Sequence, residues 1–402
     1  MLKKITSHKK KTLIFAALAC LVSGFLLFKL PTVLAASIQD TDLNTDGKVD
    51  MADLSVLLTN YGKGASTGDV NKDGQIDIFD LSMMLTNYGK TVGAANCASA
   101  TQHTPDGPDG NGGCWPGPSN TGPNAPESSM ASFNDCTIDS PGVVIDSKVV
   151  NCSPLVVGSN ATGLVIKNSY LKGGVIQSNS TASFSIQDSH IDNAVSYPAC
   201  GNGSCTAGKY ACGDPNNATT QCGVGYKNFN IYRTEIIHSN RAAYCEFNCI
   251  IENNYFHGTN LWPDITNLAH ASSVRNEQSL TLRHNSLNCD YHGPFPNNDI
   301  GCSADMSGYP DFEPIKNATI DFNLFMHTNN SADYCAYGGS SSGHNKSGDP
   351  TNATYIKFTN NIFQRGPNGK CGDAGPLTDF KINNSGNEWT NNRYDNGALI
   401  TP

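Results

Sequence analysis

The chain has 402 residues, of which 38% are hydrophobic and only 15% charged, with 39 Gly, 20 Pro and 15 Cys. This length allows two or three domains, and the low charge with high Gly argues against a coiled coil or charge-driven disorder. The net charge is −9, and the first 36 residues carry six Lys and no acid, so the remainder has −9 − 6 = −15. Such an acidic chain lacks the basic surface of a nucleic-acid-binding protein.

The first 36 residues have the features of an export signal. A basic stretch at residues 3–11 precedes an apolar run at residues 13–28, and cleavage is expected after Ala35 or Ala36. The alternative is an uncleaved membrane anchor at residues 13–28, whose 16 residues nearly cross a bilayer. Both interpretations place the rest of the chain outside the cell.

Cysteine usage agrees with an oxidising compartment. Setting Cys20 aside leaves 14 of the 15 Cys, an even number that is typical of a disulfide framework. Close spacing favours the pairs Cys97–Cys114, Cys136–Cys152, Cys245–Cys249, Cys289–Cys302 and Cys335–Cys371. Four more lie in a Gly-rich insertion, where we expect a stapled loop and a zinc site is the alternative: Cys200, Cys205, Cys212 and Cys222.

A 12-residue segment that starts at Asp42 returns 27 residues later at Asp69, and each copy precedes the sequence Leu-Ser-x-x-Leu-Thr-Asn-Tyr-Gly. Oxygen ligands fall at positions 1, 3, 5, 9 and 12, a backbone carbonyl at position 7 adds another, and Gly occupies position 6. This spacing is that of a Ca²⁺-binding loop. It predicts two Ca²⁺ ions, held by Asp42, Asn44, Asp46, Lys48, Asp50 and Asp53 and by Asp69, Asn71, Asp73, Gln75, Asp77 and Asp80.

The duplicated loop and helix at residues 42–90 resemble a type I dockerin, the module that docks secreted glycan-degrading enzymes onto cohesin domains. The resemblance implies Ca²⁺ binding and a cohesin-like partner for a module at residues 37–90. Dockerins often carry Ser/Thr pairs at loop positions 10 and 11, where this chain has Met51-Ala52 and Ile78-Phe79. The alternative is a structural spacer whose helices bury these apolar groups within the chain.

Residues 91–133 are rich in Gly, Pro, Asn and Ser, which predicts a linker and a leading loop. From residue 134 to 402 a motif recurs. Its first and third residues are apolar and flank the second, a polar turn that often contains Asn follows, and an apolar residue ends it. Its third positions are residues 145, 166, 186, 231, 251, 282, 320 and 358. A unit near 20 residues with variable insertions predicts an all-β fold, a right-handed parallel β-helix with Asn and Ser stacked at its corners. A β-sandwich is the structural alternative.

This region resembles the pectate-lyase-like superfamily of secreted β-helices, and more narrowly a group of bacterial secreted proteins of uncharacterised activity. The resemblance spans residues 114–402 and rests on segments 114–122, 144–152, 334–339 and 360–372. It implies the fold and a polysaccharide ligand, but function depends on the individual site. The Asp-Asp and Gly-His-Gly signatures of polygalacturonases do not occur.

Candidate catalytic residues follow from the register of the repeat. Lyases on this fold need a base and a cation beside a uronate, whereas hydrolases need paired carboxylates. His238, His327 and Arg365 lie seven residues beyond their third positions and His257 lies six beyond, so we expect them to line one face. A nearby insertion adds candidates that we interpret as a base and a carboxylate-neutralising cation: His270 and Arg275.

Substrate binding is assigned to residues that can stack on or pair with a sugar: Trp262, Tyr334, Tyr337 and Arg365. The sequence thus predicts an exported carbohydrate-active protein, a polysaccharide lyase or a glycoside hydrolase with a docking module. The alternative is a non-catalytic, extracellular glycan-binding or cell-surface structural protein, in which the corner histidines are only solvated.

Overall fold

The structure is a computed structural model that describes residues 38–44, 49–64, 67–71, 74–89, 97–193, 222–259, 270–290, 301–310, 313–327, 333–340 and 350–402. The expected export signal lies outside these ranges, as do four candidate site residues: Asp46, Lys48, Asp73 and Trp262. The chain separates into two compact units, Met1–Gly93 and Ala94–Pro402.

The described part of the first unit contains α2 (Ile38–Thr41), α3 (Met51–Asn60) and α4 (Ile78–Asn87). Helices α3 and α4 start at equivalent N-cap residues, Asp50 and Asp77, whose carboxylates accept from the backbone N–H groups of Ala52 and Phe79. In both helices the acid three residues on accepts from the N-cap N–H, which completes a capping box. The duplication in the sequence is therefore also a duplication in the structure.

Reciprocal backbone hydrogen bonds join the two copies of the repeat. The N–H of Gly62 donates to the carbonyl of Ile76, and the N–H of Gly89 donates to the carbonyl of Val49, both at 2.8 Å. The small core that they surround consists of Val49, Leu57, Val70, Ile76 and Met84. Because Val49 and Ile76, and likewise Leu57 and Met84, are 27 residues apart, the core is built from equivalent positions.

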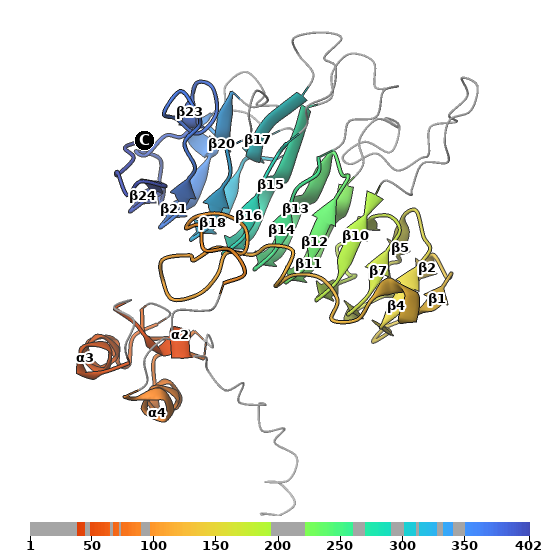
Figure 1. Ribbon diagram of the computed structural model, residues 1–402, viewed down its shortest axis with the longest axis horizontal. Coiled ribbons are helices and arrows are strands. Elements are labelled where there is room, and N and C mark those ends of the chain that lie inside the picture. Colours follow the sequence, from red (N-terminus) through yellow and green to blue (C-terminus); the bar gives the residue numbers. More distant parts are fainter. Residues whose placement is uncertain are drawn as a thin grey trace, which may run out of the picture. The chain divides into compact units, whose positions relative to one another are not determined.

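The second unit is mostly β structure with parallel sheets, and Figure 1 shows its strands stacked along one axis. Its described elements are η1 (Glu127–Ser129), β1 (Ala131–Phe133), β2 (Thr137–Ile138), β3 (Val144–Asp146), β4 (Lys148–Val150), β5 (Leu155–Val157), β6 (Leu164–Lys167), β7 (Tyr170–Leu171), β8 (Val175–Gln177), β9 (Phe184–Gln187), β10 (His190–Asp192), β11 (Cys222–Tyr232), β12 (Glu235–Ile237), β13 (Arg241–Glu252), β14 (Tyr255–Phe256), β15 (His270–Arg283), β16 (Ser286–Leu287), β17 (Gly301–Gly308), β18 (Lys316–Asp321), β19 (Leu324–Phe325), β20 (Tyr334–Gly338), η3 (Pro350–Asn352), β21 (Thr354–Thr359), β22 (Ile362–Phe363), β23 (Gly375–Thr378), β24 (Glu388–Thr390) and β25 (Arg393–Tyr394).

Each coil of this unit contributes three strand segments. Equivalent segments of successive coils pair in parallel and form three stacks, which we call the first, second and third lines. The first line runs through β3, β6 and β9, the C-terminal parts of β11, β13 and β15, and then β18, β21 and β24. The second line is the sheet β1-β4-β7-β10-β12-β14-β16-β19-β22-β25. The third line is β2-β5-β8, the N-terminal parts of β11, β13 and β15, and then β17, β20 and β23. These stacked parallel strands are compatible with a solenoid-like, all-β fold.

The predicted register of the repeat is confirmed. The eight third positions pair in order along the first line, from Ile145 with Ile166 to Ile320 with Phe358. All eight are buried in one core. Phe358 pairs in turn with Trp389, so a further coil, which the sequence analysis did not identify, extends the stack.

The corner after the first line has the same conformation in all nine coils that the described residues form. The residue two places beyond the third position has a positive φ of 43° to 60° throughout. In every coil after the first, the next residue is buried, and from the fifth coil onward it is Asn: Asn254, Asn285, Asn323, Asn361 and Asn392. Each side-chain carbonyl in this ladder except that of Asn254 accepts from the side-chain amide of the preceding Asn, at 2.8–3.0 Å. The predicted stacking of Asn at the corners is thus confirmed.

Residues 97–122, which we call the strap, fold back over the solenoid. Trp115 is fully buried between strap and solenoid, and its ring stacks on His284 at 5.2 Å. The N–H of Gly122 donates to the carbonyl of Arg233, and Gln364 donates to the carbonyl of His103. The segment that composition alone interprets as a linker therefore crosses the corners of several coils.

The five predicted cysteine pairs are all disulfides in the described residues: Cys97–Cys114, Cys136–Cys152, Cys245–Cys249, Cys289–Cys302 and Cys335–Cys371. Disulfides at this density are typical of an oxidising, extracellular environment. None of the helices in the described ranges is long and apolar enough to cross a membrane.

Candidate functional site

The structure divides the predicted catalytic residues among several places. His238 and His257 follow neighbouring strands of the second line, whereas Arg275 lies on the third line. His270 begins β15, five residues before Arg275 on the same strand, which separates them by roughly 16 Å at 3.3 Å per residue. His327 lies three coils beyond His238, where its N–H donates to Gln364.

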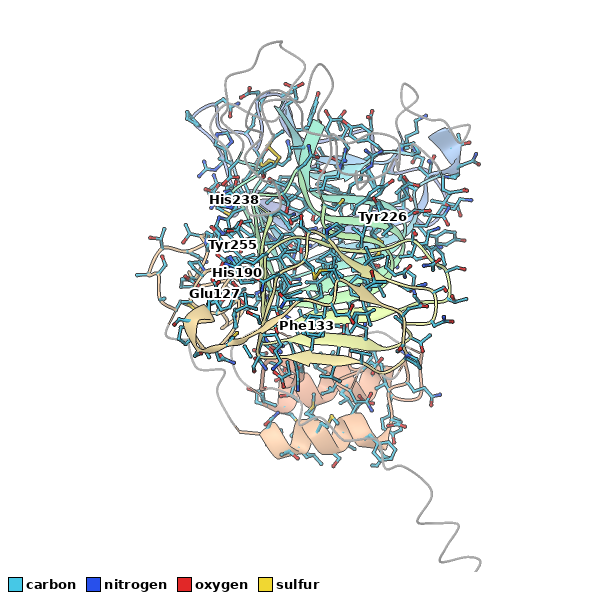
Figure 2. The ribbon with its side chains drawn as sticks, turned by 90° about the vertical axis from the view of Figure 1, so that its right-hand side faces the viewer. Glu127, Phe133, His190, Tyr226, His238 and Tyr255 are labelled. Carbon is cyan, nitrogen blue, oxygen red and sulfur yellow. A yellow bond between two sulfur atoms is a disulfide. The ribbon has the colours of Figure 1, made fainter. Side chains whose placement is uncertain are left out.

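His238 and His257 belong to a larger cluster, the histidine–carboxylate row, which comprises His190, Asp192, Glu235, His238 and His257. The carboxylate of Glu235 bridges two imidazoles, with Oε2 at 2.7 Å from His190 Nδ1 and Oε1 at 2.9 Å from His257 Nε2. His238 Nδ1 lies 2.7 Å from Asp192 Oδ1. Figure 2 shows His190 and His238 on one side of the solenoid and Tyr226 of the third line on the other.

Strand alternation explains why the row is on the surface. Ile191 and Ile236 point into the core, so their neighbours in β10 and β12, among them His190, Asp192 and Glu235, point outward. The side chains are partly exposed, from 17% for Glu235 to 40% for His238. The row is thus open to a ligand from solvent.

The two imidazoles control the charge of Glu235. Burial alone would raise its pKa, but the hydrogen bonds from His190 and His257 outweigh this effect and lower the pKa from 4.5 to about 2. Glu235 is therefore ionised at any physiological pH. It also orients each imidazole through one ring nitrogen, as a carboxylate does in catalytic triads.

Tyrosine rings lie beside the histidines. Tyr255 stacks on His257 with ring centroids 4.0 Å apart, and Tyr170 packs near His190 at 5.5 Å. Burial, followed by the charges of Asp290, Glu235 and Asp106, raises the pKa of Tyr255 to about 12. Several carboxylates therefore surround this part of the row, and the phenol stays protonated.

The separation of the row's two carboxylates matters for its chemistry. His190 pairs directly with Glu235 across β10 and β12, and Asp192 lies two residues further along β10. A strand spacing of about 4.8 Å and a rise of about 3.3 Å per residue place the Cα atoms of Asp192 and Glu235 roughly 8 Å apart. Inverting glycosidases hold their two carboxyl groups about 6.5–9.5 Å apart.

The other predicted residues form a second cluster, the tyrosine–arginine row, on the third line. Arg275 lies over the rings of Tyr244 and Tyr309, at 5.3 and 5.8 Å from their centroids. Tyr309 packs on Tyr337 at 4.7 Å, and Tyr337 contacts Tyr334 at 5.8 Å. Arg275 and the two predicted tyrosines are thus brought together in one strip.

The same strip contains Glu277, whose side chain is fully buried and accepts from the hydroxyl of Tyr244 at 2.6 Å. Burial raises the pKa of Glu277 to about 7, although Tyr244 and Arg275 oppose the shift. Arg365, the remaining predicted sugar ligand, pairs instead with Asp395 at 2.5 Å on the next coil.

The described parts of the two predicted Ca²⁺ loops fit an oxygen-ligand site. Asp53 and Asp80 at position 12 are buried, and backbone N–H groups of their loops donate to both carboxylate oxygens of each. Asp69 at position 1 accepts from the N–H of Gly74 at position 6, which folds the loop toward its own centre. Oδ1 of Asp80 accepts from the N–H groups of both Val70 and Asn71, whereas Oδ2 of Asp53 and of Asp80 each accepts from one N–H and retains a lone pair. The residues at both ends of the loop can therefore still ligate a hard cation.

One further group of metal-ligating residue types converges in the described ranges: Asp305, Cys335 and Cys371. The two cysteines are bonded to each other, so they offer no thiolate to a metal. Burial raises the pKa of Asp305 well above its usual range, and the carboxyl accepts from the N–H of Cys289. This group is therefore structural.

Sequence reasoning missed His190, Asp192, Glu235 and Tyr255. It followed the position seven residues beyond each third position, whereas the outward positions of the second line lie four and six residues beyond. The available signal was the apolar residue five places beyond each third position, which marks its two neighbours as outward-facing.

Comparisons of the chain with protein-family models, with curated proteins and with solved structures give no match.

Proposed function

We propose that this chain is an exported carbohydrate-active protein that hydrolyses a neutral polysaccharide at the histidine–carboxylate row. The observation that supports this proposal best is the pair of outward carboxylates, Asp192 and Glu235, each held by imidazole on neighbouring coils. Their Cα atoms lie roughly 8 Å apart, a spacing that allows the two carboxylates to flank a water molecule and a glycosidic bond.

The two carboxylates have different surroundings, which suits different roles. Glu235, which its pKa of about 2 keeps ionised but makes a weak base, orients the attacking water and accepts its proton. The Asp192–His238 pair supplies the proton to the leaving sugar oxygen. Attack and departure occur on opposite faces of the sugar, so the expected product has inverted anomeric configuration.

The charge around the row favours a neutral glycan over a uronate. Asp106, Glu235 and Asp290 all act on the Tyr255 hydroxyl, and a substrate carboxylate placed there would meet three like charges. Proton abstraction next to a uronate needs a cation at that carboxylate, whereas hydrolysis of a neutral sugar does not. We therefore place hydrolysis ahead of the lyase reaction.

The rest of the chain supports delivery of this activity outside the cell. Residues 1–36 act as the export signal, and the second unit is a right-handed β-helix of the pectate-lyase-like type, the handedness that parallel crossovers almost always take. The first unit binds two Ca²⁺ ions and docks onto a cohesin-like domain. Apolar residues at equivalent positions of its two helices are exposed and available to a partner: Met51, Leu58, Ile78, Phe79 and Leu85.

The test is a reducing-sugar assay of the oxidised, Ca²⁺-loaded chain on a panel of neutral polysaccharides, beside an ultraviolet assay for unsaturated products on uronate polymers. Glu235→Gln and Asp192→Asn should each reduce hydrolysis about 100- to 10,000-fold. Asp188→Asn is the matched control, because Asp188 is a partly exposed carboxylate paired with Arg233 at the adjacent corner. Full activity in Glu235→Gln would refute the assignment.

A second function, binding of a glycan without cleavage, is favoured by the tyrosine–arginine row, since aromatic strips stack on sugar rings and Arg pairs with acidic groups. Retention on affinity gels without turnover in either assay would support it. In that case Tyr337→Ala should lose retention, whereas the exposed Tyr355→Ala on β21 should keep it.

A further inference from the structure

We propose that His284 and His103 form a pH-dependent clasp that holds the strap on the solenoid only while His284 is protonated and His103 is neutral. This inference does not depend on the proposed hydrolysis. It rests on two histidines of opposite hydrogen-bonding character that meet the same Trp115 ring.

His284 is held as a double donor. Its Nδ1 lies 2.7 Å from the side-chain oxygen of Asn253, and its Nε2 lies 3.2 Å from Oδ2 of the strap residue Asp109. The ionised carboxylate of Asp109 and the side-chain oxygen of Asn253 can only accept hydrogen bonds. Both ring nitrogens of His284 therefore donate. An imidazole that donates from both nitrogens is positively charged. The ring also packs against Trp115 at 5.2 Å and Phe322 at 5.0 Å, and these two rings lie 5.0 Å from each other, so the cation is the third member of a compact aromatic cluster.

His103 is held as an acceptor. The indole N–H of Trp115 donates to His103 Nδ1 at 3.3 Å, which requires that nitrogen to carry no proton. Burial lowers the pKa of His103, against the opposing charges of Asp395 and Asp109. Gln364 fixes the backbone of His103 by donating to its carbonyl. The neutral state is therefore the one that completes the contact with Trp115.

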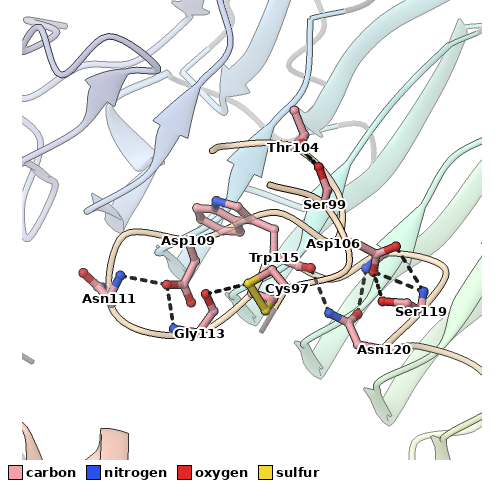
Figure 3. Close-up of a disulfide and its surroundings, with 12 residues drawn as sticks. Cys97, Ser99, Thr104, Asp106, Asp109, Asn111, Gly113, Trp115, Ser119 and Asn120 are labelled. Carbon is pink, nitrogen blue, oxygen red and sulfur yellow. Dashed lines mark hydrogen bonds between the residues drawn. A yellow bond between two sulfur atoms is a disulfide. The ribbon is translucent and has the colours of Figure 1, made fainter. Parts of the chain in front are cut away.

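Besides the clasp, the strap is held to the solenoid through backbone groups of Gly122 and His103, and the bonds around Asp109 are local. Asp109 accepts from the N–H groups of Asn111 and Gly113, and the Cys97–Cys114 disulfide lies beside Gly113, as Figure 3 shows. The other charged groups near the two histidines are paired with each other: Arg283 with Asp321, and Arg365 with Asp395. Asp109 is therefore the charge in the strap that responds to His284.

Two opposite pH limits follow from this arrangement. Protonation of His103 on acidification removes the acceptor of the indole N–H, and deprotonation of His284 on alkalinisation removes the cation that pairs with Asp109. The strap is held between these limits and released on both sides. Release would also move Asp106, a strap residue whose charge acts on Tyr255.

The test follows the indole N–H signal of Trp115 by NMR in the full oxidised chain from about pH 4 to pH 9, a range that spans the usual titration of histidine. Trp115→Phe assigns the signal. We expect the protection factor of this N–H, which is the exchange rate of a free indole at the same pH divided by the observed rate, to be high at intermediate pH. It should be at least about tenfold lower at both ends, as the loss of one hydrogen bond implies. A protection factor without these two limits would overturn the proposal.

Two variants separate the limits without removing the ring contacts. His103→Gln keeps a side-chain acceptor at every pH, so only the acid limit should disappear. Asp109→Asn removes the charge that needs a cation, so only the alkaline limit should disappear. If either variant keeps both limits while its circular dichroism spectrum matches that of the parent chain, the clasp is not formed by these histidines.

Discussion

Buried ionisable residues in this protein differ sharply in how their charge is balanced. Glu235 is surrounded by donors that stabilise its charge, whereas Glu277 receives a hydroxyl and a backbone N–H but no close counter-charge that outweighs its burial. Their pKa values accordingly move in opposite directions, to about 2 and to about 7. A carboxyl of the second kind costs stability wherever it is ionised.

Glu277 gives a pH dependence of opposite sign to that of most carboxylates. Because its folded-state pKa lies above the ordinary 4.5, the folded chain binds a proton that the unfolded chain has lost between pH 4.5 and about 7. Stability should therefore fall as pH rises through this window, by about 3 kcal/mol for a shift of this size. Urea unfolding of the solenoid at about pH 5 and pH 8 measures this loss.

Glu277→Gln should abolish that loss, because the amide keeps an acceptor for Tyr244 and never ionises. The control is Glu388→Gln, which removes a partly exposed carboxylate paired with Lys357. Equal pH slopes for the parent chain and Glu277→Gln would show that burial of this carboxyl has no net cost.

At the scale of elements, the asparagine ladder unites the coils more specifically than the apolar stack does. The carbonyl of Asn323 accepts from the backbone N–H and the side chain of Asn285, and its amide donates to Leu282 and to Asn361. Every polar atom of this fully buried side chain is thereby satisfied. Removal of this side chain leaves hydrogen-bonding groups on both neighbouring coils without a partner.

Asn323→Ala should destabilise the solenoid by about 2–4 kcal/mol, since several buried donors and acceptors lose their partners. Asn230→Ala, on the outward side of β11, should change stability by less than about 0.5 kcal/mol. Thermal unfolding of both variants beside the parent chain measures the difference. Equal melting temperatures would mean that water replaces the missing amide.

The elements that were predictable are those whose side chains are constrained by the core. Ile145 through Phe358 were recognisable because each coil repeats the same apolar pattern. Trp389 was missed, because Asn387 replaces the apolar residue that the motif has two places before its third position. The candidate site was harder. Strands of the second line have only two or three residues, so alternation alone does not show which side chains face outward.

Contacts between distant segments were not predictable at all. Nothing in the spacing of Trp115 indicates that it packs on His284, which lies 169 residues further along the chain. The Gly and Pro content of residues 91–133 is typical of a linker, and only the contacts of Trp115, Asp109 and His103 reveal a strap. Composition describes local backbone preference, whereas packing partners depend on the complete fold.

At the scale of the whole molecule, the two units have separate cores of very different size. Among the described residues, the core of the first unit has five buried side chains, all between Val49 and Met84, whereas that of the second runs through every described coil. A domain this small is marginal without help from metals or disulfides. We therefore expect the first unit to need Ca²⁺ and the second to be independent of it.

Calorimetry of the full chain should show two transitions in the presence of Ca²⁺. Chelation with EGTA should remove or lower the smaller one and reduce the helical circular dichroism signal, while the larger transition stays unchanged. Asp69→Asn, which alters one loop only, should lower the smaller transition by an intermediate amount. A helical signal that survives EGTA would contradict a role for Ca²⁺ in the first unit.

The constant corner of the solenoid has a consequence for protein engineering. Every described coil keeps one fixed spacing from the core residue of the first line, through the left-handed corner, to the core residue of the second line. The number of residues per coil therefore varies only in the other segments of the coil. The Cys289–Cys302 disulfide clamps the two ends of one such variable segment. A foreign peptide grafted between these cysteines would be displayed on a rigid base without shifting the register of any strand, which makes this solenoid a natural presentation scaffold.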